Sequence, residues 1–257
     1  CADRAPGSRL PLSVCDVTAP FSRDSQLSPF AADVARRVLA VRERMHAAQR
    51  RGGHGQDVTL IAVTKTHGPD AVEAAYEAGV HDVGENRVQE AETKRAALAT
   101  LPVRWHLIGH VQRNKARAAV QFDLVHGLDS VRLADALHDA AQAAERVVDV
   151  LVQVNVSGEA SKFGVPAHEV GAFGETLRRY EALRVRGVMT MAPFDADERT
   201  LRAVFAGARD CRETLRSAGH AAELLSMGMS GDFEIAIEEG ATHVRLGTVL
   251  FGAREAA

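Results

Sequence analysis

The sequence has no long hydrophobic run and little net charge. No apolar stretch approaches the roughly 20 residues that a membrane-spanning helix needs, so we expect no membrane segment. The formal net charge is −3 over 257 residues, which gives no electrostatic reason to expect nucleic-acid or membrane-surface binding. With 46% hydrophobic and 25% charged residues, the composition is typical of an ordinary globular protein in water.

Cysteine is also scarce. The three cysteines, Cys1, Cys15 and Cys211, lie far apart and form no Cys-x-x-Cys pair. Such usage is typical of a reducing compartment, so we expect a cytoplasmic protein without a disulfide framework. Cys211 lies in a predicted helix and has no obvious histidine partner, which indicates a buried thiol and not a nucleophile.

No metal site is expected either. His106 and His110 are four residues apart, a spacing that can bind zinc on a helix. Here the two histidines flank Gly109 at the end of a predicted strand, where their side chains do not share a helix face. We therefore expect no metal ligation by this pair.

The chain divides into a tail and one domain. Residues 1–28 are rich in Ser, Pro, Asp and Arg and lack the apolar core of a signal peptide, so we expect a poorly ordered N-terminal tail. Residues 29–257 show no composition break and no long linker. A single domain is expected there, because α/β barrels often reach this size as one unit.

Strand-like and helix-like segments alternate through this domain. Strands are expected at 58–64, 80–83, 103–108, 122–126, 147–155, 184–189, 223–226 and 242–246. Helices are expected at 30–51, 70–78, 86–99, 112–119, 130–144, 166–180, 197–218 and 232–239, with a short closing helix in 248–255. This alternation predicts βαβ units and a parallel sheet. Eight strands favour a closed (β/α)8 TIM barrel over an open sheet.

A lysine ends the first predicted strand. Lys65 follows the apolar run Leu60–Thr64 and precedes a turn at Gly68 and Pro69. Burial of the lysine stem disfavours the ammonium form, lowers the pKa and leaves a neutral amine, which Schiff-base chemistry requires. The alternative is an ordinary lysine whose stem is covered while its amine reaches solvent.

Polar and glycine residues follow the seventh and eighth predicted strands. The segments Ser226–Asp232 and Gly247–Thr248 offer hydroxyls and close backbone approach. In parallel barrels these two loops often bind a phosphate group. The alternative is that Ser230 or Asp232 only caps the next helix, and the two interpretations are compatible.

A Schiff-base lysine and a phosphate site in one barrel mouth indicate pyridoxal 5'-phosphate (PLP). The lysine would hold the aldehyde carbon, and the two loops would hold the phosphate. Arg245 could then face the pyridine nitrogen, where a permanent cation keeps that nitrogen unprotonated and weakens the ring as an electron sink. The alternative for Arg245 is a salt bridge at the barrel end.

Short motifs recur in order over about residues 30–254. They are Ala62–Thr66, Gly84–Glu90, Trp105–Gly109, Gln112–Lys115, Ser161–Gly164, Arg186–Met189, Leu225–Ser230, Val244–Thr248 and Phe251–Arg254. In these motifs and their order the chain resembles the YggS/PROSC family of PLP-binding proteins, also called pyridoxal phosphate homeostasis proteins.

The resemblance implies an alanine-racemase-like barrel of PLP fold type III, with Lys65 holding the cofactor as a Schiff base and Arg245 at the pyridine nitrogen. Three further groups of residues follow from it. They are Asn86, His106 and Gly109 at the ring; Ser226, Gly247 and Thr248 at the phosphate, with Met227 and Gly228 shaping that loop; and Lys162 as a secondary or transfer lysine.

The resemblance also implies a function. We expect a monomeric carrier or buffer of intracellular PLP, linked to amino-acid and keto-acid balance, which passes PLP to apo-enzymes and has no robust catalytic activity. One departure is that His67 stands where the family often has a second lysine, so a role for that lysine is in doubt here.

Two enzyme functions are the alternatives. An amino-acid racemase on the same barrel needs a base on each face of the substrate carbon. The chain's two tyrosines, Tyr76 and Tyr180, fall in predicted outer helices, which argues against efficient racemisation but not against a weak activity. A cofactor-free Schiff-base aldolase would share the barrel and the lysine but would show no visible chromophore.

Overall fold

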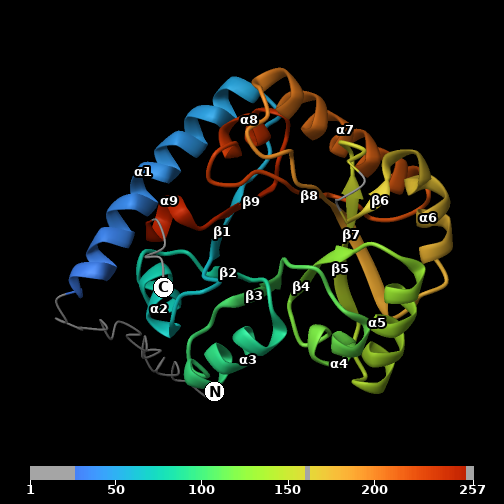
Figure 1. Cartoon of the computed structure of the whole chain (residues 1–257), viewed down its shortest axis with the longest axis horizontal. Coiled ribbons are helices and arrows are strands. Elements are labelled where there is room, and N and C mark those ends of the chain that lie inside the picture. The colour runs from blue at the N-terminus through green and yellow to red at the C-terminus, as the bar shows by residue number, and fades with distance from the viewer. Residues whose placement is uncertain (1–26, 160–162, 253–257) are drawn as a thin grey trace, which may run out of the picture.

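In the computed structural model, which describes residues 27–159 and 163–252, eight parallel strands close into a barrel (Figure 1). This confirms the predicted fold. The barrel strands are β1 (Thr59–Val63), β2 (Asp82–Glu85), β3 (Arg104–Leu107), β4 (Leu124–Leu128), β5 (Val148–Asn155), β7 (Leu183–Met189), β8 (Leu224–Ser226) and β9 (His243–Leu246).

The strand pairing explains how the barrel closes. β1 pairs with both β2 and β9, and β4 pairs with β5, so the sheet has no free edge inside the ring. The register places Gly84 beside His106 and Ile61 beside Arg245. Because all of these pairings are parallel, the carboxyl ends of the strands meet at one end of the barrel, where loop residues can form a site.

One short strand was not expected from the sequence. β6 (Val165–Pro166) is two residues long and pairs with the end of β5. Phe163 lies just before this strand and lines the barrel mouth, where Gln153 Nε2 donates to the Phe163 carbonyl oxygen at 3.2 Å. A segment this short has too little pattern to reveal a strand.

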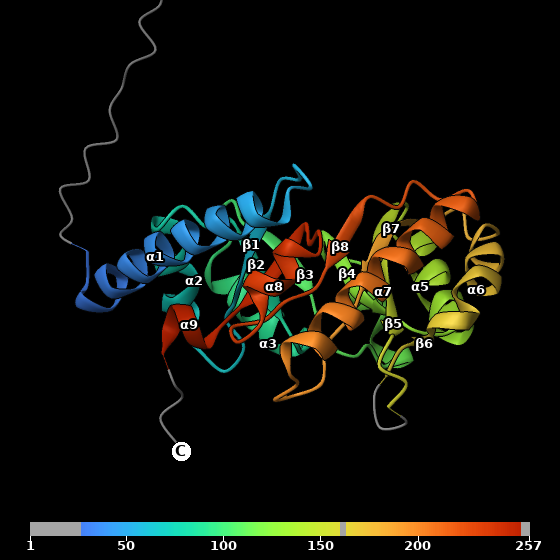
Figure 2. The ribbon, with the colours of Figure 1, turned by 90° about the horizontal axis from the view of Figure 1, so that it is seen from above.

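Helices form the outer layer in both views (Figures 1 and 2). They are α1 (Pro29–Gly52), α2 (Pro69–Glu77), α3 (Val88–Ala97), α4 (Ala116–Ala119), α5 (Val131–Ala143), α6 (Val170–Leu177), α7 (Glu198–Ser217), α8 (Phe233–Glu238) and α9 (Thr248–Phe251). The segment expected as one helix at 112–119 is a 3-10 turn, Arg113–Lys115, followed by the single turn of α4. A similar 3-10 turn, Ala167–Glu169, precedes α6.

The first helix shows how the sequence sets these boundaries. Ser28 accepts a hydrogen bond from the Ala31 amide at its start, and Pro29 occupies the first turn. Gly53 ends it in the left-handed conformation, with φ of 68°. The buried positions, Val34 and Val38 among them, recur at helical spacing and pack α1 onto the barrel.

The barrel interior contains an unusual number of polar side chains. Most buried residues are aliphatic, as expected of a packed core. The buried polar residues are Thr64, Asp82, Glu85, Lys94, His106, His126, Gln153, Thr190, Ser226 and Arg245. Buried polar groups need partners, so the hydrogen bonds of these residues define the environment of the site.

Within the described residues, no helix is long and apolar enough to cross a membrane. Cys211 is buried in α7, where burial raises the pKa of its thiol to about 11. This position agrees with the expected buried thiol, since a nucleophilic cysteine needs a lowered pKa.

Candidate functional site

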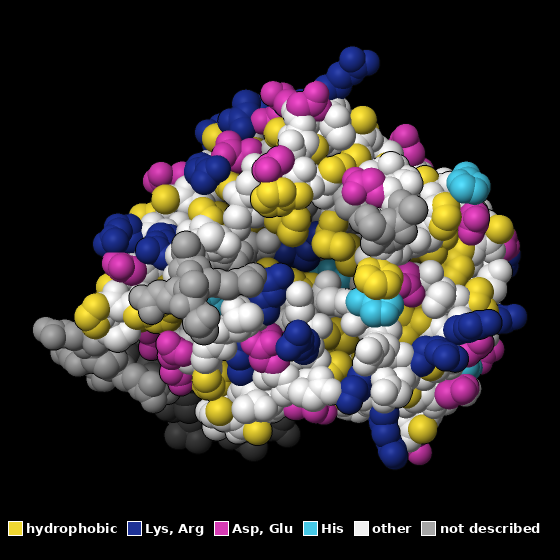
Figure 3. Space-filling view, viewed as in Figure 1, with side chains coloured by type: hydrophobic (Ala, Val, Ile, Leu, Met, Phe, Trp, Pro, Cys, Tyr) yellow, Lys and Arg dark blue, Asp and Glu magenta, His cyan; other side chains and the backbone are white. Residues whose placement is uncertain are grey.

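A cavity of about 570 Å3 opens at the carboxyl ends of the strands. The same face is hollowed in Figure 3, with hydrophobic side chains around the hollow and basic side chains inside it. The structure brings six of the residues predicted from sequence to this cavity. They are Lys65, Asn86, Gly109, Arg245, Gly247 and Thr248.

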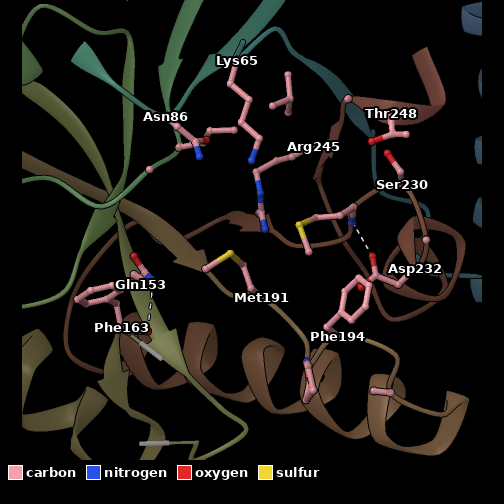
Figure 4. A pocket seen from close by; sticks show the side chains of 18 of the residues that line it. Lys65, Asn86, Gln153, Phe163, Met191, Phe194, Ser230, Asp232, Arg245 and Thr248 are labelled. Carbon is pink, nitrogen blue, oxygen red and sulfur yellow. Dashed lines mark hydrogen bonds between the residues drawn. The ribbon is translucent and has the colours of Figure 1, made fainter. Parts of the chain in front are cut away.

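The labelled side chains converge from different strands (Figure 4). Lys65 enters from the end of β1 and Arg245 from β9, and both reach into the same cavity. Gly109 matters for the shape of the wall, since a Cβ atom there would lie 2.2 Å from the carbonyl oxygen of Asn86. Glycine is therefore required at this position for Asn86 to approach the β3 end.

Four apolar lining residues were not named as site residues from the sequence, although Phe163 and Met229 lie within the motifs Ser161–Gly164 and Leu225–Ser230. Phe163, Met191, Phe194 and Met229 give one side of the cavity an apolar, partly exposed wall, and Phe194 is 93% exposed. These positions lie in loops, where apolar residues have no periodic neighbours to mark them. Their exposure is informative because large hydrophobic side chains at a cavity mouth are typical of ligand-binding walls.

The part of the cavity next to Met229 also carries polar side chains and joins the two loops that the sequence highlighted. Ser230 Oγ accepts a hydrogen bond from the Val249 amide at 3.4 Å, linking the loop after β8 to the start of α9. Asp232 accepts from the Met229 amide and does not cap α8 with its side chain. The simple capping alternative is thus not what the structure shows for Asp232.

The backbone on both sides of Lys65 is held by charged groups, of which Glu85 and Lys94 are buried and Glu90 is half-buried. Lys94 donates from Nζ to Glu85 Oε1 at 2.6 Å and to the carbonyl oxygen of Thr64 at 2.7 Å. The Thr64 hydroxyl also donates to Glu85. These contacts fix the residue immediately before Lys65.

Thr66, immediately after Lys65, is held in the same way. Its φ of 69° is in the left-handed region, which is uncommon for a residue with a branched side chain. Its amide donates to Glu90, which also lies 3.3 Å from Lys94 Nζ. The backbone that aims Lys65 is therefore over-determined, as strained functional positions usually are.

Burial dominates the electrostatics of this cluster. Glu85 and Lys94 are both nearly inaccessible, and burial raises the pKa of Glu85 despite the hydrogen bonds from Lys94 and Thr64. Among the described residues, Glu85 Oε2 finds no hydrogen-bond partner. Glu85 and Glu90 both belong to the motif Gly84–Glu90, which was the sequence signal that marked this cluster.

Two predicted site residues lie behind the cavity wall instead of on it. Ser226 is fully buried and bonds to Arg245 Nη1 at 2.7 Å and to His126 Nδ1 at 2.9 Å. His106 lies inside the barrel, with Nδ1 3.1 Å from His126 Nε2 and Nε2 2.9 Å from Asp82 Oδ1. Both support Arg245 from behind, so direct contact with a ligand in this cavity does not follow from their positions.

Met227 and Gly228 also lie away from the cavity surface. Met227 is fully buried in the core. Gly228 has a φ of 93°, and a Cβ atom there would lie 2.7 Å from the Cβ of Ala236. Its carbonyl oxygen accepts from the Arg245 amide at 3.0 Å. A role in shaping the loop after β8 agrees with these contacts and stays a prediction.

Some of the remaining residues named from the sequence lie outside the described ranges, and others pack against aromatic rings. Lys162 and residues 1–26 of the expected tail lie outside the described residues. The His67 ring packs against Phe251, with centroids 5.1 Å apart. The exposed His110 stacks on Phe163 at 4.2 Å, away from the buried His106. Across the described ranges, no group of three or more potential ligand side chains is placed to hold a metal ion.

Neither tyrosine lines the cavity. Tyr76 lies in α2, with its ring against His81 at 4.8 Å. Tyr180 follows α6, three residues past the observed end of the helix, and its hydroxyl donates to Asp135 at 2.6 Å. Burial and this aspartate raise the pKa of Tyr180. No tyrosine is therefore placed to act as a base at the cavity.

A lysine and a buried arginine at the carboxyl end of a parallel barrel define the class of the protein. Residues 38–255 match the family model described as alanine racemase, N-terminal domain. The structure also resembles the alanine racemase of Streptomyces coelicolor A3(2), with a TM-score of 0.71 and 20% identity, covering 87% of this chain and 59% of that one. At this identity the likeness shows the fold alone.

Closer relatives identify the family within this class. The chain is 43% identical over 230 residues to the pyridoxal phosphate homeostasis protein of Pseudomonas aeruginosa, which covers 89% of this chain and 97% of that protein. It is 38% identical to PipY of Synechococcus elongatus PCC7942, solved with PLP bound, with a TM-score of 0.76 over 85% of this chain and 100% of that one. The chain belongs to the pyridoxal phosphate homeostasis protein family.

Proposed function

We propose that this protein binds PLP at Lys65 and serves as a carrier or buffer of the cofactor, without robust catalysis of its own. The observation that carries the proposal is the placement of Lys65 and Arg245 in one cavity beside the two polar loops. The family relatives named for PLP homeostasis, and PipY solved with PLP, support it.

The residues at the cavity fit this cofactor by their chemistry. PLP offers an aldehyde, a phosphate and a ring nitrogen, and it supplies electrophilic amine chemistry when bound. Lys65 would supply the amine that holds the aldehyde carbon, and Ser230, Thr248 and the backbone of Gly247 would supply hydrogen-bonding groups for the phosphate. At Gly247 a Cβ atom would lie 3.3 Å from the carbonyl oxygen of Val63, so a larger residue would crowd this wall.

Arg245 would supply a permanent positive charge to the cofactor. Burial lowers the pKa of its guanidinium to about 10, with Asp232 opposing this shift, so it stays a cation at neutral pH. If it faced the ring nitrogen of bound PLP, this cation would keep that nitrogen unprotonated and reduce electron withdrawal by the ring. Both tyrosines lie away from the cavity, so a racemase would also lack its expected second base.

Absorbance of the PLP-loaded protein tests the proposal. We expect a visible chromophore in the wild type and in the control Lys115→Ala, and none in Lys65→Ala. In the same preparation, alanine racemisation should stay far below the roughly 10 per second typical of enzymes. Turnover near that rate would favour the racemase, and a colourless wild type would refute PLP binding.

A further inference from the structure

Arg245 is buried at the inner wall of the cavity and is held by neutral oxygens. Only 5% of the residue is exposed. Its guanidinium donates to Ser226 Oγ at 2.7 Å and to the carbonyl oxygen of Thr190 at 2.9 Å. Its orientation therefore depends on two acceptors, of which Ser226 is the one that can be altered by substitution.

The hydrogen bonds behind Ser226 continue through the barrel interior. Ser226 Oγ lies 2.9 Å from His126 Nδ1, and His126 Nε2 lies 3.1 Å from His106 Nδ1. His106 Nε2 then lies 2.9 Å from Asp82 Oδ1. These side chains come from four strands, β8, β4, β3 and β2, and Asp82 is the first residue of β2, at the amino-terminal end of the barrel.

The chemistry of Arg245 sets one end of the hydrogen-bond chain. A guanidinium only donates, so Ser226 accepts from it. The hydroxyl proton of Ser226 is then free to point to His126 Nδ1, which lies 2.9 Å away. A neutral His126 with Nδ1 as acceptor carries its proton on Nε2 and donates to His106 Nδ1. His106 in turn donates from Nε2 to Asp82.

The opposite end of the hydrogen-bond chain is compatible with the same direction. Burial alone would raise the pKa of Asp82, but hydrogen bonds from His106 and Arg104 outweigh it and hold the pKa at about 2. An ionised carboxylate only accepts, so His106 must donate to it. Burial lowers the pKa of His126 well below its usual value, which keeps this ring neutral.

We propose that Ser226, His126 and His106 form a one-way hydrogen-bond chain that positions Arg245 and connects its positive charge to the Asp82 carboxylate across the barrel. A buried hydrogen-bond network in which every donor meets an acceptor stabilises the folded state more than a network with unpaired groups. The remaining charged or titratable groups facing it are His243, whose ring lies 6.2 Å from that of His106, Arg104 on Asp82, and Asp232 near Arg245.

The chain gives Ser226 and His106 a role different from direct ligand contact. They are positioning residues that act through Arg245. Loss of Ser226 removes one of the two acceptors that orient the guanidinium and leaves His126 Nδ1 without its donor. The predicted effect on PLP binding rests on the proposed function, whereas the predicted proton positions in the hydrogen-bond chain do not.

Nitrogen-15 NMR of the histidine rings tests the chain in the protein without cofactor. Long-range correlation spectra at pH 7, assigned with His126→Gln and His106→Gln, should show both rings neutral with the proton on Nε2. A His126 ring protonated on Nδ1, or on both nitrogens, would overturn the chain. This result stands whether or not PLP binds.

PLP binding tests the positioning role. Ser226→Ala and His126→Phe should each weaken PLP retention about tenfold, equivalent to about 1.4 kcal/mol, and shift the visible spectrum in the same sense as Arg245→Gln. Ser226→Thr, which keeps the hydroxyl, should restore both readouts. Ser130→Ala is the matched control, because Ser130 caps α5 and its loss costs stability without touching the chain.

The possible outcomes separate the two proposals. If Arg245→Gln alters the spectrum while both Ser226→Ala and His126→Phe match the wild type, the positioning role is wrong. If the wild type fails to bind PLP, the proposed function is wrong, and the NMR result alone decides the chain.

Discussion

Two buried cations near the cavity are stabilised in different ways. Lys94 forms a direct ion pair with Glu85 at 2.6 Å, whereas Arg245 donates to a hydroxyl and a carbonyl oxygen. A direct carboxylate partner would neutralise much of the field that Arg245 projects into the cavity. Lys94 therefore holds the backbone around Lys65, and the charge of Arg245 remains available to interact with a ligand.

The buried histidines predict how stability depends on pH. Burial lowers the pKa of His243 to about 4, and it lowers the pKa of His126 well below its usual value. The unfolded chain protonates both near pH 6.5. As pH falls below about 6.5, the unfolded state binds protons that the folded state excludes, so the free energy of unfolding decreases by up to about 1.4 kcal/mol per pH unit for each histidine.

Urea unfolding between about pH 7 and pH 4.5 measures this slope. The wild type should lose stability steadily over the interval. His243→Asn should lose less, because one of the two groups no longer titrates, and the His243 contribution itself should end near pH 4. Equal slopes for the wild type and this variant would contradict the assigned burial effect.

At the scale of elements, β7 and β8 approach each other closely at Gly187. The pairing of β5 with β7 shifts register between Val150 and Leu151, and Gly187 lies just past this irregularity. Its φ is 154°, and a Cβ atom there would lie 1.9 Å from the carbonyl oxygen of Leu224. Glycine at this position lets β8, which carries Ser226 to the wall behind the cavity, approach β7.

A matched pair of glycine substitutions tests this contact. Gly187→Ala should lower the free energy of unfolding by about 2–4 kcal/mol, because backbone atoms must move. Gly171→Ala in α6 should raise it by up to about 1 kcal/mol, since its Cβ would meet only the Thr214 methyl at 3.5 Å. Chemical denaturation of both variants measures the difference, and equal stability for the two would contradict the strand contact.

At the scale of the whole molecule, the barrel was predictable because its strands are apolar and its helices periodic. Each predicted barrel strand overlaps an observed one, and Lys65, Asn86 and Arg245 do meet at one cavity. Lys65 and Asn86 follow the ends of β1 and β2, and Arg245 lies in β9 next to the loop at Gly247. In a parallel barrel these strand ends meet on one face, which brings the three residues together.

The depth of a side chain within the barrel was not predictable. Ser226 and His106 also lie at or near strand ends, yet register and the layered interior place them behind Arg245. The apolar wall was missed because Phe163 and Phe194 lie in loops without periodic neighbours. Such facts depend on contacts between strands distant in sequence, which a local pattern does not contain.

The attachment point of PLP tests the central claim most directly. The loaded protein would be reduced with borohydride and digested, and the modified peptide would be sequenced by mass spectrometry. The account predicts a single modified residue, Lys65, in the peptide that follows β1. A modification found only on Lys94, Lys115 or Lys162, with Lys65 unmodified, would contradict it.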